Sequence, residues 1–212
     1  MLRILGVDPG TVKAGWAIVP IDLTCKEYGI WKADKASLPI EERLGSLLEE
    51  MEIKFGNYVM GGIEENGEFI VQQVPLKPEF NILAVESQFF GQNAKTALRL
   101  AEAKGIILAL AGKYGIPVIE VPPTLIKKIA TGHGGSGKAT VARMITGILE
   151  IKEEIQYDDI TDAMAIAYAV AHRISRTKTF LKNVKLWPED YTGVEFAKIV
   201  RKAWKKIKLL RV

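Results

Sequence analysis

The 212-residue sequence contains only one cysteine and two histidines. Cys25 has no second cysteine with which to form an internal disulfide, and it cannot build a cysteine zinc cage. His133 and His172 are far apart in the sequence, which argues against a histidine-rich metal site. Any metal bound by this chain would therefore need carboxylate ligands.

The sequence also lacks long apolar runs and long polar tracts. No apolar run approaches the roughly 20 residues that a membrane helix needs, so we expect no membrane partner. The first ten residues, MLRILGVDPG, carry a single positive charge and soon reach a polar Asp-Pro-Gly turn, which is too short for a signal peptide. We therefore expect a cytoplasmic protein. A hydrophobic share of 48% and a charged share of 25% are typical of a folded globular chain.

The formal net charge of +4 is unevenly distributed along the chain. Residues 177–212 hold ten Lys or Arg and three Asp or Glu, whereas residues 1–176 carry a net charge of −3. Within this basic extension, the apolar residues of 193–211 follow helical spacing with lysines on the opposite side. Such a tail fits a polyanionic partner such as nucleic acid, or a capping helix with a solvated face.

The hydrophobic pattern predicts a mixed α/β sheet with helices packed on it. Three short antiparallel strands come first, followed by helices that alternate with two further buried strands. The strands are expected at 2–8, 14–20, 26–32, 82–86 and 116–121, and the helices at 39–55, 91–114, 123–130, 138–150 and 158–176. Residues 57–80 hold Asn66-Gly67 between two apolar runs, which predicts an inserted β-hairpin.

Four carboxylates stand at positions where chemistry is expected. Asp8 ends the first strand and Glu86 ends a buried strand, where an unpaired charge is costly unless a partner such as lysine neutralises it. Asp159 and Asp162 are three residues apart and share a helix face, although the helix N-terminus alone also favours them there. Clustered carboxylates repel each other and fit Mg²⁺, and a pair of such ions can promote phosphodiester hydrolysis.

Several of these segments together resemble the RuvC family of Holliday-junction resolvases, which have a ribonuclease-H-like fold. The similar segments are GVDPGTVKAGWAIV at 6–19, residues 84–111, the Thr131–Lys138 loop and YDDITDAMAIAYAVAHR at 157–173. The resemblance implies a five-stranded ribonuclease-H-like sheet over residues 1–176, with 177–212 as a basic C-terminal extension. It also implies a catalytic, metal-binding set that holds two Mg²⁺ ions, with Mn²⁺ as a substitute. That set is Asp8, Glu86, Asp159 and Asp162.

The resemblance further implies residues that contact DNA and a second copy of the chain. Phe89 matches an aromatic residue near the DNA branch point, where base stacking would favour an unpaired base. Lys138, together with Lys127 or Lys128, matches lysines near the scissile phosphate. The helix at 91–114 is implied to form a homodimer through small residues at four-residue spacing. The alternatives are that Phe89 is a core residue and that the small residues pack on the protein's own sheet.

Two nucleotide-binding patterns require comparison with the sequence. GHGGSGK at 132–138 resembles a Walker A loop, but Ala139 replaces the required hydroxyl residue and a helix precedes the loop, so we reject a P-loop. The pattern D-x-G-T-x-x-x-G, which begins at Asp8, is also found in actin-like and sugar-kinase-like ATP-binding proteins. Those proteins need two lobes and a second phosphate loop, for which 212 residues leave no room.

The sequence as a whole favours a Mg²⁺-dependent, structure-selective DNA endonuclease. We expect it to resolve four-way (Holliday) junctions as a homodimer, with other branched DNA as an alternative substrate. A non-catalytic DNA-binding module is disfavoured, because four carboxylates facing DNA would weaken binding unless metal neutralised them.

Overall fold

A computed structural model describes residues 1–25, 27–56, 58–65, 68–75, 78–87, 94–177, 198, 200–202 and 204. Of 58–65 and 68–75 it describes the backbone only. Within these residues, no helix is both long enough and apolar enough to cross a membrane.

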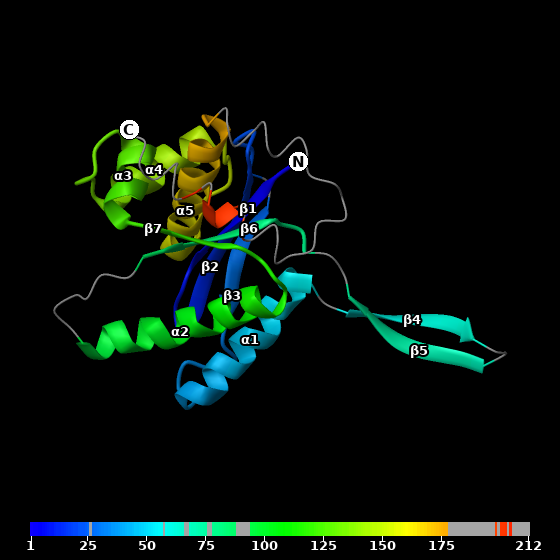
Figure 1. The fold of residues 1–212 in the computed structure, drawn as a ribbon. Coiled ribbons are helices and arrows are strands. Elements are labelled where there is room, and N and C mark those ends of the chain that lie inside the picture. The colour runs from blue at the N-terminus through cyan, green and yellow to red at the C-terminus, as the bar shows by residue number, and fades with distance from the viewer. Residues whose placement is uncertain are drawn as a thin grey trace.

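The main sheet has five strands in the order β3-β2-β1-β6-β7 (Figure 1). The strands are β1 Arg3–Asp8, β2 Lys13–Pro20, β3 Glu27–Lys32, β6 Ile82–Glu86 and β7 Val118–Val121. β1, β2 and β3 pair antiparallel, whereas β6 runs parallel to both β1 and β7. The mixed five-stranded sheet predicted from the sequence is confirmed.

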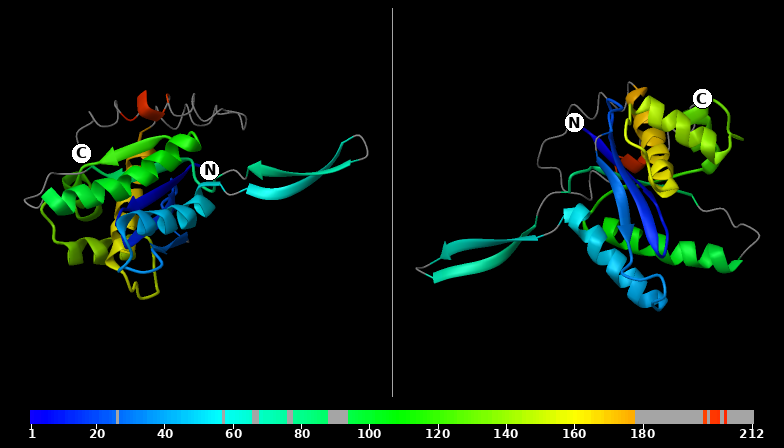
Figure 2. Two further views of the ribbon diagram at one scale, coloured as in Figure 1. Left: turned by 90° about the horizontal axis from the view of Figure 1, so that it is seen from below. Right: turned by 180° about the vertical axis from the view of Figure 1, so that it is seen from behind.

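Over residues 1–177, as far as the structure describes them, five helices cover the two faces of this sheet (Figures 1 and 2). They are α1 Ile40–Gly56, α2 Ala94–Lys113, α3 Pro123–Thr131, α4 Lys138–Ile148 and α5 Asp158–Ser175. One apolar core lies between the sheet, α1 and α2, and includes Leu5 and Met51. The other lies between the sheet and α3, α4 and α5, and includes Ile4 and Met164. The helix starts and ends differ from the predicted ones by a few residues.

Strand alternation places one set of β1 and β6 side chains toward α5. Ile4 belongs to the core beneath α5, and Asp8 lies on the same face because successive side chains alternate along a strand. The same alternation places Glu86 on the face of Ile82, which also belongs to that core. The ends of these two parallel strands therefore present carboxylates to one helix.

Helix α5 lies directly on the backbone of β1 and β2, because both strands carry a glycine at the contact. A Cβ atom at Gly6 would overlap the backbone carbonyl of Ala163, and one at Gly15 would overlap the carbonyl of Asp159. Only hydrogen fits at these two positions. This close approach places the first turns of α5 beside the end of β1.

The predicted hairpin is present as a separate two-stranded sheet. β4 (Tyr58–Glu65) pairs antiparallel with β5 (Glu68–Pro75), and Ile63 pairs with Ile70. The two strands extend away from the main sheet (Figures 1 and 2). The hairpin is inserted between α1 and β6 and adds no strand to the five-stranded sheet.

Part of the basic extension packs on the body of the protein. Val200 and Trp204 are buried in the same core as α5 and β7, and they are four residues apart, as expected for one face of a helix. Lys198, Arg201 and Lys202 are exposed. The described residues of the tail thus have an apolar inner side and a charged outer side.

We expect Gly15→Ala to lower the free energy of unfolding by about 2–4 kcal/mol, because the added methyl group must push α5 off the backbone of β2. Gly45→Ala is the matched control, since a Cβ atom at Gly45 in α1 meets nothing within 4 Å. The control should be stabilised by about 0.5–1 kcal/mol, because alanine favours the helix over glycine. Urea denaturation followed by circular dichroism measures both, and equal stability of the two variants would contradict this packing.

Candidate active site

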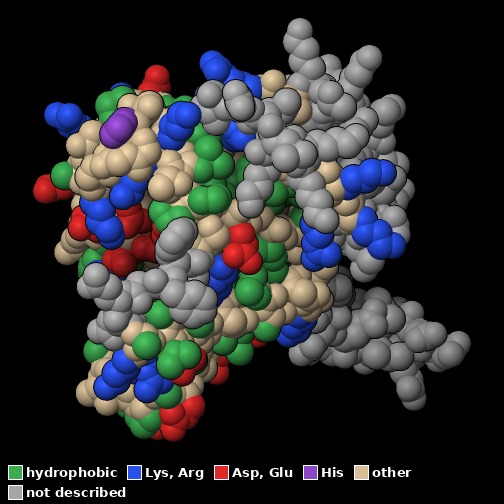
Figure 3. Space-filling model, turned by 60° about the vertical axis from the view of Figure 1, so that its left-hand side comes forward, with side chains coloured by type: hydrophobic (Ala, Val, Ile, Leu, Met, Phe, Trp, Pro, Cys, Tyr) green, Lys and Arg blue, Asp and Glu red, His purple; other side chains and the backbone are tan. Residues whose placement is uncertain are grey.

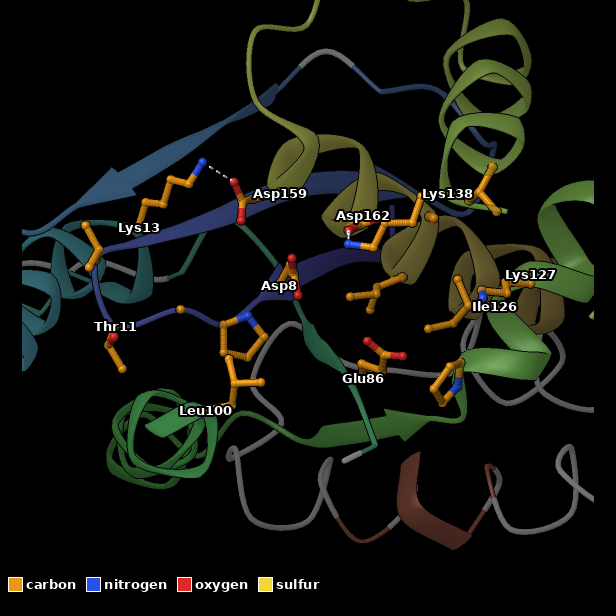
Figure 4. Close-up of a pocket in the computed structure, with 17 residues that line it drawn as sticks. Asp8, Thr11, Lys13, Glu86, Leu100, Ile126, Lys127, Lys138, Asp159 and Asp162 are labelled. Carbon is orange, nitrogen blue, oxygen red and sulfur yellow. Dashed lines mark hydrogen bonds and ion pairs between the residues drawn. The ribbon is translucent and has the colours of Figure 1, made fainter. Parts of the chain in front are cut away.

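The four predicted carboxylates line one cavity of about 560 Å³ (Figure 4). Asp8 lies at its centre, Glu86 approaches from the end of β6, and Asp159 and Asp162 project from the first turns of α5. Asp158, the neighbour of Asp159, does not line the cavity. The space-filling view shows acidic side chains in a hollow beside lysine or arginine side chains (Figure 3).

Crowding and burial change the protonation of the two strand-end carboxylates. Burial, together with the neighbouring charges of Asp162, Asp159 and Glu86, raises the pKa of Asp8 from 3.8 to about 7. Burial and the charge of Asp162 also raise the pKa of Glu86. In both groups burial is the larger cause, and the neighbouring carboxylates add to it.

Two lysines supply part of the missing positive charge. Lys13 Nζ lies 2.9 Å from Asp159 Oδ2, and Lys138 Nζ lies 3.0 Å from Asp162 Oδ2 (Figure 4). These hydrogen bonds raise the pKa of both lysines. Lys138 is 77% exposed and can leave its partner at little cost in burial. Lys138 can therefore act as a replaceable counter-ion.

The chemical type of these donors, carboxylate oxygen, suits a hard divalent cation, although the four side chains line the cavity without being gathered around one point. Among the residues that the structure describes, no three acidic, histidine or cysteine side chains are arranged to hold a metal ion. The ammonium groups of Lys13 and Lys138 instead neutralise one carboxylate each. Carboxylate oxygens are the ligands that Mg²⁺ and similar ions prefer, and a bound cation would offset the burial and the neighbouring charges that raise the pKa of Asp8.

The comparisons with known proteins identify the family of this chain. Residues 69–172 match the family model described as crossover junction endodeoxyribonuclease RuvC. The RuvC of Desulfitobacterium hafniense is 31% identical over 182 residues, which cover 82% of this chain and 94% of that protein. The RuvC of Carboxydothermus hydrogenoformans is 36% identical over 174 residues, which cover 79% of this chain and 94% of that protein. The chain belongs to the RuvC family.

Solved RuvC structures have the same fold. T. thermophilus RuvC in complex with a Holliday junction substrate superposes with a TM-score of 0.61 at 26% identity, covering 80% of this chain and 92% of that one. Another Thermus thermophilus RuvC structure gives a TM-score of 0.60 at 25% identity, covering 87% of this chain and 97% of that one. Membership of the RuvC family argues against the actin-like or sugar-kinase-like ATP-binding alternative. Gly15, the last residue of the D-x-G-T-x-x-x-G pattern, lies at the contact with α5.

Of the three lysines that the RuvC resemblance implied to lie near the scissile phosphate, two line the cavity. Lys138 and Lys127 line the cavity. Lys128, the neighbour of Lys127 on α3, is exposed and does not line it. Phe89 lies outside the described residues.

Two lysines near the site were not predicted from the sequence. Lys13 reaches Asp159 from the start of β2, and only strand register could have indicated this. Lys104 of α2 is buried beneath the site, where its Nζ donates to the Glu86 carbonyl at 3.1 Å and pairs with Glu120 at 2.7 Å. Lys104 thereby fixes the end of β6. No local pattern marks a lysine among the apolar residues of a helix as buried.

The raised pKa of Asp8 predicts a pH-dependent instability of the metal-free protein. An aspartate that binds its proton more tightly when folded makes stability fall as pH rises from about 4 to about 7, with no further change above that range. Asp8→Asn removes the charge, so the variant should be more stable than the parent at pH 8 by roughly 1–4 kcal/mol. Urea denaturation in EDTA at pH 5 and pH 8 measures the difference. A gain of equal size at both pH values would contradict the pKa shift.

Proposed function

We propose that this chain is a structure-selective DNA endonuclease that resolves four-way (Holliday) junctions by phosphodiester hydrolysis. The observation that carries the proposal is the convergence of four carboxylates from β1, β6 and α5 in a lysine-bordered cavity of a RuvC-family chain. A relative with the same fold, T. thermophilus RuvC, is bound to a Holliday junction substrate. That complex favours the four-way junction over other branched DNA.

The RuvC family consists of metal-dependent nucleases, and we assign Mg²⁺ to this site, with two ions per site. Asp8, Glu86, Asp159 and Asp162 would hold them, and Mn²⁺ would substitute. When bound, such ions supply activation of a water molecule and stabilisation of the leaving oxygen.

The chain's own cations would position the DNA backbone at this cavity. Lys138 and Lys127 attract phosphate, and Lys138 can exchange Asp162 for a phosphate oxygen because its side chain is mostly exposed. The loop before Lys138 is held in shape by Thr131, whose Oγ1 lies 2.7 Å from Ser136 Oγ and accepts a hydrogen bond from the His133 backbone N–H. Lys138 is therefore presented from a structured loop.

Branch selectivity would come from Phe89, in line with the family resemblance. Phosphate contacts alone do not distinguish a junction from a duplex, because both have the same backbone. An aromatic ring three residues after Glu86 can stack on a base that is already unpaired at the branch point, where unstacking costs least.

The proposal includes a homodimer formed through α2. Ala101, Gly105 and Ala109 are exposed, so they do not pack on the protein's own sheet. Leu98 and Leu108 are also exposed on this helix, and their spacing from Ala101 and Gly105 places them on the same face. A stripe of small residues beside exposed leucines suits close packing with a second copy, and two-fold symmetry suits paired cuts in a four-way junction.

The experiment that tests the function is cleavage of a synthetic four-way junction beside a linear duplex, with and without Mg²⁺. We expect Mg²⁺-dependent cleavage of the junction alone. Asp8→Asn, Glu86→Gln and Asp162→Asn should each lower turnover by at least about 100-fold, because each removes a metal ligand, while junction binding is kept. Asp158→Asn is the matched control outside the cavity and should cleave normally. Near-native turnover in any of the three variants would remove that residue from the catalytic set.

Assembly is tested separately. Ala101→Arg should convert a dimer into a monomer in sedimentation velocity at micromolar concentration, because a long charged side chain blocks close helix packing. Ala36→Arg adds the same charge at an exposed loop position and should stay dimeric. A monomeric parent protein would refute the assembly.

A further inference from the structure

Three residues form a cationic platform at the β2–β3 side of the cavity: Lys13, Lys32 and Tyr157. Lys13 and Lys32 are direct partners in the pairing of β2 with β3. Their Nζ atoms lie 4.9 Å and 4.6 Å from the centre of the Tyr157 ring, and Lys32 Nζ donates a hydrogen bond to the Tyr157 hydroxyl at 2.9 Å. Tyr157 immediately precedes α5.

The pairing of these two lysines is unfavourable by itself. Like charges directly opposite on neighbouring strands destabilise a sheet, and the contacts of both ammonium groups with the Tyr157 ring oppose this repulsion. Lys13 also pairs with Asp159. Among the described residues, Lys32 Nζ has no carboxylate partner, since the nearby Glu50 accepts from the backbone N–H of Lys32 instead.

Lys32 therefore keeps hydrogen-bonding capacity for an external anion. An ammonium group has three donors, and one is used on the Tyr157 hydroxyl. The side chain of Lys32 is exposed, and that of Lys13 is 43% exposed, so both can be reached from solvent.

The platform adjoins the catalytic cavity. Lys13 lines that cavity, and in Figure 4 it lies on the opposite side of the carboxylates from Lys138 and Lys127. A DNA strand that crosses the carboxylates would thus meet cations both before and after them.

We propose that Lys13, Lys32 and Tyr157 bind a DNA backbone phosphate next to the scissile one on the same strand. The inference rests on the proposed function, because it assumes that DNA occupies the cavity. The platform sets the direction in which the strand leaves the site, and it reads no base. The ammonium group of Lys32 contacts the DNA phosphate without a competing carboxylate, whereas that of Lys13 contacts both Asp159 and the phosphate.

The competing explanation is structural: Lys32 serves only to tie the end of β3 to the start of α5 through Tyr157. A neutral donor would make that tie as well, without placing a second ammonium group opposite Lys13. The two explanations differ in whether the loss of the Lys32 charge changes the salt dependence of DNA binding.

The test is the affinity of the full chain for a four-way junction in EDTA, measured across salt concentrations. Lys32→Gln should lower the slope of log K against log salt by about 0.9, the amount expected for one lost phosphate contact. Between about 50 and about 200 mM salt, its affinity should therefore change roughly 3–4-fold less than that of the parent. Lys35→Gln removes an equal charge from an exposed position three residues further along and should keep the parental slope.

A neutral phosphate analogue locates the contact. A single methylphosphonate placed next to the scissile position should weaken binding by the parent and have no further effect on Lys32→Gln. Unchanged slope and affinity in Lys32→Gln would overturn the platform, even if its melting temperature fell. A parent chain that neither binds nor cleaves junctions would instead refute the proposed function.

Discussion

The site depends on the contact of α5 with the bare backbone of β1 and β2. Gly6 and Gly15 let the helix approach until its carbonyl groups occupy the space that side chains would fill. Asp159 contributes its backbone to this contact and its side chain to the cavity, so packing and chemistry are fixed by the same residue. A larger residue at either glycine would move Asp159 and Asp162 away from Asp8.

This packing concentrates negative charge, which the folded chain must tolerate. The pKa of Asp8 rises to about 7 because burial and three neighbouring carboxylates oppose its ionisation. Lys13 and Lys138 relieve part of the repulsion from opposite sides of the cluster. An arrangement that is unfavourable for the empty protein is suited to a bound cation and to a phosphate that brings its own charge.

Helix α2 connects the catalytic cavity with the proposed dimer surface. Its buried side carries Lys104, whose ammonium group holds the carbonyl of Glu86 and the carboxylate of Glu120. Its outer side presents Ala101 and Gly105 to solvent. A second copy bound to the outer side of α2 would therefore contact the same helix whose Lys104 holds the end of β6.

The sequence by itself determined the elements and the acidic residues, because these depend on neighbours in the chain. Alternation along short apolar runs predicted the strands, Asn66-Gly67 predicted the hairpin, and three-residue spacing put Asp159 and Asp162 on one helix face. That Asp8 and Glu86 share a cavity followed from their positions at strand ends, and the family resemblance completed the set.

Only the tertiary structure decided which basic residues surround the acids. The register of β2 with β3 sets Lys13 opposite Lys32, and the placement of α5 brings the Tyr157 ring within reach of both ammonium groups. The orientation of α3 selects Lys127 over Lys128 for the cavity. These contacts join residues far apart in the chain, and a long, flexible lysine leaves no periodic signal in the sequence. The positions of the lysines around the carboxylates therefore depend on how the strands and helices pack, and residue patterns along the chain do not reveal them.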